Sequence, residues 1–130
     1  MADLEQRPIP LKLSRLRGSR TARVLFWSAA AFAFVMAVLP HPPRIPGNPN
    51  DKLQHISAFA ALALLGSFAY PGTALLNLLL RLSFFGALIE LVQAIPALHR
   101  DSDVMDWLAD TAAVAVVLTL VWWRRRAANA

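Results

Sequence analysis

The chain contains no cysteine, which excludes disulfide bonds and any chemistry that needs a thiolate. It is also poor in charge, because 16% of its 130 residues are charged and 57% are hydrophobic. In an ordinary soluble domain, about 25% of the residues are charged. The low charge and the mean hydropathy of +0.47 therefore exclude an ordinary soluble domain. The length leaves room for one small membrane domain.

Two common catalytic signatures are missing as well. There is no HExxH or comparable ligand spacing, so the sequence predicts neither a metal site nor a cofactor. A divalent metal stays open as an alternative, because the chain has His, Glu and Asp residues and carboxylates suit magnesium, calcium or manganese. There is no GxSxG segment either, which argues against a serine nucleophile.

Four apolar segments are present instead, at about residues 24–39, 53–70, 74–95 and 104–123. Roughly 20 apolar residues are needed to cross the hydrocarbon layer as a helix, so the sequence predicts an all-α, polytopic membrane protein with four transmembrane helices. Residues 1–22 are expected to form a basic cytoplasmic tail, 23–126 the membrane domain and 127–130 a short second tail. The first segment follows basic residues, as a secretory signal does. No small-residue cleavage site follows Leu39, so we expect this segment to remain as a helix.

The distribution of Lys and Arg predicts the orientation. Ten of the thirteen lie before the first segment, after the last one, or near the start of the third. The positive-inside rule then places both termini in the cytoplasm, with the protein in the bacterial cytoplasmic membrane. The other three, Arg44, Lys52 and Arg100, fall on the outer side with six of the eight acidic residues. We expect the basic termini to contact membrane lipids, and we expect no binding to nucleic acid.

Ionisable and polar side chains interrupt the second, third and fourth segments near their outer ends. A charge within a spanning helix costs several kcal/mol unless it is paired or hydrated, so a convergent set of such groups indicates a functional site. We predict one polar, ligand-binding pocket at the outer leaflet. Its members are Asp51, Lys52, His55, Glu90, Gln93, Arg100, Asp106 and Asp110.

Helical spacing supports this grouping. Asp51 and His55 are four residues apart and share one helix face, as do Glu90 and Gln93 on the third helix. With a rise of ~1.5 Å per residue, Glu90 and Asp110 are expected ~9 Å from the outer ends of their helices, at comparable depth. If a reaction is catalysed, Glu90 and His55 are the candidate general bases, because partial burial tunes such groups toward neutral pH.

Structural alternatives stay open for these groups. Asp51 could be only a helix cap, a role that Asn50 would serve equally well. Lys52 could simply extend to the headgroups. For Glu90 the alternative is a structural ion pair with Arg100 or Lys52. Three residues compete to cap the fourth helix: Asp101, Ser102 and Asp103.

The order and spacing of the polar residues resemble the VanZ-like family of small bacterial membrane proteins. The similarity covers about residues 51–115 and comprises Asp51, Lys52, His55 and Phe59, then Ile89, Glu90 and Gln93, then Arg100, Asp106 and position 110. Two positions depart from the family pattern: Asp110 stands where the family usually has Asn, and Ala113 where it usually has Gly. The resemblance implies a four-helix envelope protein. One member is associated with low-level teicoplanin resistance, so antibiotic resistance is an implied phenotype.

On these grounds we expect the protein to bind or modify an envelope amphiphile, such as a lipid-linked cell-wall intermediate or a glycopeptide-type drug. Lys52 and Arg100 suit phosphate or carboxylate, and Glu90, Asp106 and Asp110 suit amines or hydroxyls. A non-catalytic membrane scaffold or assembly factor is the first alternative, with the polar residues as an internal ion-pair network. A small proton-coupled transporter is the second, and it would need a homo-oligomer to provide a pathway. No classified enzyme activity is predicted.

Overall fold

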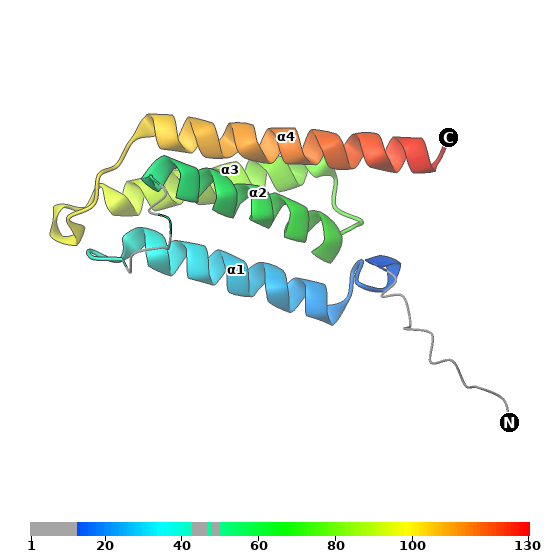
Figure 1. Ribbon diagram of the computed structural model, residues 1–130, viewed down its shortest axis with the longest axis horizontal. Coiled ribbons are helices and arrows are strands. Elements are labelled where there is room, and N and C mark those ends of the chain that lie inside the picture. The colour runs from blue at the N-terminus through cyan, green and yellow to red at the C-terminus, as the bar shows by residue number, and fades with distance from the viewer. Residues whose placement is uncertain (1–12, 43–46, 48–49) are drawn as a thin grey trace, which may run out of the picture.

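The structure, a computed structural model, is a bundle of four long helices (Figure 1). It describes residues 13–42, 47 and 50–130. The long helices are α1 (Arg20–Val38), α2 (Asp51–Ala69), α3 (Leu75–Gln93) and α4 (Val104–Ala128), with two 3-10 turns, η1 (Leu13–Arg15) and η2 (Pro96–Leu98). No strand occurs in these described residues, so the predicted all-α fold with four membrane-length helices is confirmed.

The outer faces of the helices are apolar. Phe84 and Leu91 on α3 are 70% and 69% exposed, and Phe32 on α1 is 66% exposed. Each long helix has at least 19 residues. A helix of that length spans about 28 Å, close to the hydrocarbon thickness of a bilayer. The protein is therefore a multi-pass membrane protein, and its exposed apolar side chains suit a lipid environment.

The start of α1 and the end of α4 lie at the same end of the bundle, on the right of Figure 1. The starts of α2 and α4 lie at the opposite end. Near the end of α4, the guanidinium carbon of Arg126 is 4.9 Å from the ring centroid of Trp122. This cation–π contact, beside the exposed Trp123, is typical of an anchor at a membrane surface.

Two helices extend beyond their predicted limits by four or more residues, namely α1 and α4. α1 begins at Arg20 because Ser19 caps it, its hydroxyl accepting a hydrogen bond from the amide of Ala22 at 3.0 Å. Part of the expected basic tail thus forms η1 and the first turn of α1, whereas residues 1–12 lie outside the described part of the chain. At the other end, α4 continues to Ala128, because arginine favours helix and basic groups are stabilising at a helix C-terminus.

The caps of α2 and α4 are also settled. Asn50, and not Asp51, caps α2, since its side-chain oxygen accepts from the amide of Leu53 at 2.7 Å. Asp103 caps α4 by accepting from the amide of Met105 at 2.8 Å. Most of the proline-rich connection between α1 and α2, at 43–46 and 48–49, lies outside the described residues.

α2 lies at the centre of the bundle and packs mainly against α4 and α1, while α3 packs mainly against α4. Phe59 of α2 is only 2% exposed. A Cβ atom at Gly86 of α3 would lie 3.3 Å from the Phe59 ring, so the glycine allows this ring to pack closely against α3. Glu90 follows Gly86 by one helical turn, and this close packing positions it near the first turns of α2.

Candidate functional site

The predicted polar residues belong to the first two turns of α2 and α4, to the end of α3 and to the connection before α4. These helix ends lie together at one end of the bundle (Figure 1). Five of these polar residues are buried, with no more than 8% of each residue exposed: His55, Glu90, Gln93, Asp106 and Asp110. Asp106 and Asp110 occupy successive turns of one face of α4. Burial of so many ionisable groups requires that each be compensated by its neighbours.

His55 is the centre of this polar cluster. Its Nδ1 lies 3.2 Å from Oδ2 of Asp110 and 3.9 Å from Oε1 of Glu90. Its Nε2 lies 4.0 Å from Oδ2 of Asp51, one turn earlier on α2. One imidazole therefore joins α2, α3 and α4. His55, Glu90 and Asp110 are all metal-ligand types, and one ligand atom from each lies within 4.8 Å of the other two.

Glu90 connects α3 to the start of α4. Its Oε2 accepts a hydrogen bond from the amide of Asp103 at 2.9 Å, where the positive end of the α4 dipole favours a carboxylate. The hydroxyl of Ser102 donates to the Glu90 backbone carbonyl at 2.8 Å. The sequence indicated Ser102 only as a helix cap, because a bond to another helix leaves no mark in local spacing.

The two cationic side chains pair with carboxylates other than Glu90. Nζ of Lys52 is 2.8 Å from Oδ1 of Asp106, and Nη2 of Arg100 is 3.3 Å from Oδ1 of Asp51. This differs from the structural alternative in which Glu90 pairs with Arg100 or Lys52. The reason is positional: Arg100 precedes α4 and contacts the first residue of α2, whereas Glu90 is directed into the bundle toward His55.

Gln93 lies apart from this group although it shares a helix face with Glu90. Its Nε2 donates to the backbone carbonyl of Ala37 at 2.9 Å, near the end of α1. The last carbonyls of a helix have no partner within the helix, and Gln93 satisfies one of them in a buried position. Gln93 therefore ties α3 to α1.

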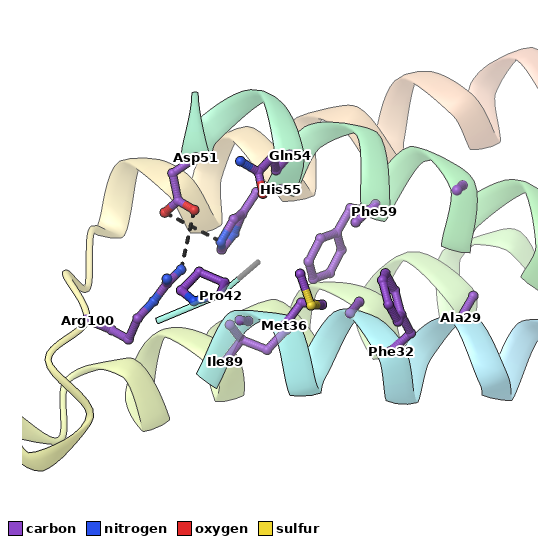
Figure 2. Close-up of a pocket in the computed structure, with 14 residues that line it drawn as sticks. Ala29, Phe32, Met36, Pro42, Asp51, Gln54, His55, Phe59, Ile89 and Arg100 are labelled. Carbon is purple, nitrogen blue, oxygen red and sulfur yellow. Dashed lines mark hydrogen bonds and ion pairs between the residues drawn. The ribbon is translucent and has the colours of Figure 1, made fainter. Parts of the chain in front are cut away.

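A cavity of about 250 Å³ opens beside the polar cluster, between α1 and α2 (Figure 2). Asp51, His55 and Arg100 line one end of it. Farther along, Figure 2 shows Phe59 of α2 and Phe32 of α1 on its walls. The cavity is thus charged at one end and apolar along the rest of its length.

The α1 wall of the cavity was not among the predicted site residues. Ala29, Ala33 and Ala37 recur every four residues and lie on one face of α1. Small side chains at such spacing leave room between helices that larger ones would fill. This alanine spacing is visible in the sequence, but it carries no charge and so gave no reason to assign α1 to the site.

The predicted set therefore divides into two parts. Asp51, His55 and Arg100 line the cavity, and the others lie in the interhelical contacts around it: Lys52, Glu90, Gln93, Asp106 and Asp110. This arrangement can accept cations at its buried carboxylates and anions at Arg100.

Comparisons of the chain with protein-family models, with curated proteins and with solved structures found no match, so its function is argued from this geometry.

Proposed function

We propose that this protein binds an anionic amphiphile in the outer leaflet of the bacterial cytoplasmic membrane. The headgroup would contact Arg100, and the acyl part would lie along the apolar wall formed by α1 and α2. Lipid-linked cell-wall intermediates are the favoured ligand class, because they combine phosphate with a long acyl or prenyl chain. We also propose that the protein is a member of the VanZ-like family, because the spacing of its polar residues resembles that family of envelope proteins.

The observation that carries the proposal is the polarity of the cavity. Its ionisable side chains are confined to one end, and its remaining walls are mostly apolar (Figure 2). An amphiphile likewise has a charged headgroup at one end and an apolar chain along the rest of its length. A purely structural ion-pair network needs no open apolar space beside it. The volume of about 250 Å³ is slightly below the roughly 300–1,000 Å³ of drug-sized pockets, so part of the ligand would remain in the surrounding lipid.

Arg100 supports an anionic headgroup. A guanidinium group binds phosphate or carboxylate through two parallel hydrogen bonds. Its present contact with Asp51 is long, at 3.3 Å, and a phosphate can compete for it. The Arg100 side chain is only 12% exposed, and shielding from water strengthens its attraction for an anion.

Mass spectrometry of the lipids that co-purify in a mild detergent tests this proposal. Wild type should retain a phosphate-bearing acyl lipid. Arg100→Gln, which loses a charged hydrogen bond, and Ala58→Leu, which fills the cavity, should each retain at least about tenfold less. Matched controls on exposed positions of α3 and α4, Arg81→Gln and Ala112→Leu, should retain the wild-type amount.

Equal lipid retention in wild type and in all four variants would contradict the proposal and favour a scaffold role. Displacement of the bound lipid by added teicoplanin would identify the second ligand class, a glycopeptide-type drug with an acyl chain. In that case, cells that express wild type, but not Arg100→Gln at equal protein level, should tolerate more of the drug.

A further inference from the structure

The buried triad of His55, Glu90 and Asp110 brings together three ligand types from three different helices. One ligand atom from each residue lies within 4.8 Å of the other two. The closest pair, His55 Nδ1 and Asp110 Oδ2, is 3.2 Å apart, and Nδ1 is 3.9 Å from Glu90 Oε1. Two ligand atoms bound to one zinc ion are separated by about 3.4 Å, given bond lengths of about 2.1 Å in a tetrahedral site. The spacing of the triad therefore already approaches that of a metal site.

Two oxygen atoms of the triad are buried without a hydrogen-bond partner among the described residues, namely Glu90 Oε1 and Asp110 Oδ1. The side chain of Asp110 is 2% exposed and that of Glu90 is 10% exposed. An unpaired buried carboxylate oxygen is costly, and such atoms call for a specific explanation. Glu90 Oε1 is also the atom that faces Nδ1 of His55, so it is directed into the centre of the triad.

The charge balance of the cluster also favours a cation. Its four carboxylates belong to Asp51, Glu90, Asp106 and Asp110, and its two cationic groups belong to Lys52 and Arg100. With His55 neutral, these groups leave a net formal charge of −2. An uncompensated charge inside a membrane protein is destabilising, and one divalent cation would neutralise the net charge of −2.

The surroundings of His55 resemble the outer shell of a metal site. Metal-binding histidines commonly donate their second ring N–H to a carboxylate, which fixes the ring orientation. In this protein Nδ1 faces Glu90 and Asp110, while Nε2 lies on the opposite side, 4.0 Å from Asp51, which is the distance of an ion pair and not of a hydrogen bond. Asp51 is itself held by Arg100 (Figure 2).

From this geometry we infer that His55, Glu90 and Asp110 bind one divalent transition-metal ion, with zinc and manganese as the metals that suit one imidazole and two carboxylates. An imidazole ligand disfavours magnesium and calcium, which prefer oxygen donors only. The sequence argued against a metal because it lacks a known spacing within one segment, and that criterion cannot detect ligands contributed by three helices. The inference does not depend on the proposed amphiphile, which Arg100 and the apolar cavity would bind.

The test uses the full-length protein in detergent, stripped with EDTA and then titrated with Zn²⁺ or Mn²⁺ alone, without added lipid. We expect each chain to bind one metal ion. For Mn²⁺, binding is measured as the loss of the EPR signal of the free ion. Metal should raise the melting temperature of wild type, and EDTA should reverse the increase. This measurement on wild type stands even if a variant fails to fold.

Variants locate the ion. Glu90→Gln and Asp110→Asn should each weaken metal binding by at least about tenfold, because each removes the negative charge of a ligand and keeps the shape of the side chain. Asp51→Asn should weaken metal binding by about tenfold, because Asp51 helps to orient His55. The matched control is Asp101→Asn, which removes an exposed carboxylate beside the same end of α4 and should leave the affinity unchanged. Failure of stripped wild type to bind either metal overturns the inference. So does equal binding by wild type, Glu90→Gln and Asp110→Asn, which would place the ion elsewhere.

Discussion

His55 and Asp110 face each other across the α2–α4 contact, with Nδ1 and Oδ2 only 3.2 Å apart and both residues buried. The other carboxylate oxygen of Asp110, Oδ1, has no hydrogen-bond partner in the described part of the chain. Asp110 therefore joins two helices while carrying an unsatisfied charged atom. Such a residue is suboptimal for folding and is expected where a site has been shaped for binding.

We predict that Asp110→Asn is at least as stable as wild type when both are metal-free, by roughly 0–2 kcal/mol. The amide keeps the shape of the side chain, can still accept from His55, and removes one buried negative charge. Thermal unfolding in detergent with EDTA measures the difference. Asp106→Asn is the comparison on the same helix face, and it should lower the melting temperature because Lys52 loses its partner at 2.8 Å. A clear loss of stability in Asp110→Asn would show that this charge is structural.

The contact between Arg100 and Asp51 predicts a selective coupling. In double-mutant cycles on thermal stability, Arg100→Gln and Asp51→Asn should couple by about 0.5–1 kcal/mol, because Asp51 is half-exposed and the pair is partly screened. Arg100→Gln and Glu90→Gln should be additive, since Arg100 contacts Asp51 and Glu90 contacts His55. If Arg100→Gln couples with Glu90→Gln and is additive with Asp51→Asn, then Arg100 pairs with Glu90 and not with Asp51.

Glu90 and Asp110 illustrate what the sequence could predict about the site. Their positions in otherwise apolar helices, together with the helical rise, indicated comparable depth, and the structure brings both to His55. The choice of partners could not be predicted, because it depends on how the helices are rotated against one another. Arg100 follows His99, whose φ of +50° is left-handed and reverses the direction of the chain. No rule of helical spacing predicts that Arg100 then reaches Asp51.

The four-helix fold was accessible from the sequence because hydrophobic length alone identifies a spanning helix. The limits of the helices depend on caps and were less accessible. Ser19 starts α1 four residues before the apolar segment begins at Val24, which a hydropathy criterion cannot detect. The α1 wall of the cavity was not predicted, because it consists of alanines and other apolar residues that resemble ordinary lipid-facing or core positions.

Gln93 should be a strong contributor to stability. Gln93→Ala removes a buried hydrogen bond to the Ala37 carbonyl and leaves a cavity, so we expect a loss of about 2–4 kcal/mol. Gln93→Met retains most of the volume but leaves the buried Ala37 carbonyl without its partner, for a cost of about 1–2 kcal/mol. Asn77→Ala, at an exposed position of α3, is the control and should stay within about 0.5 kcal/mol of wild type. Similar losses in the alanine and methionine variants would mean that packing contributes little.

Gly18 controls how the chain enters α1. Its φ is +71°, and its amide donates to the carbonyl of Phe68 at 2.7 Å. Gly18→Ala should therefore cost about 1–2 kcal/mol, the penalty of a left-handed backbone for a residue with a Cβ atom. Gly72→Ala is the matched control, because a Cβ at Gly72 meets no atom within 4 Å and its φ is not positive. If both variants unfold at the wild-type temperature, the backbone at position 18 carries no left-handed penalty.

The absence of cysteine makes the orientation directly measurable, because wild type gives no background in thiol labelling. Gly72 precedes α3 and Asp101 follows it, so these exposed positions lie at opposite ends of the bundle. The concentration of basic residues at both termini predicts that the Gly72 end is cytoplasmic. In intact bacteria, an impermeant maleimide should label Asp101→Cys, and it should label Gly72→Cys only after the membrane is opened. The reverse pattern would place the polar cluster on the cytoplasmic side, where ligands of the outer leaflet could not reach Arg100, and the amphiphile proposal would then fail in its present form.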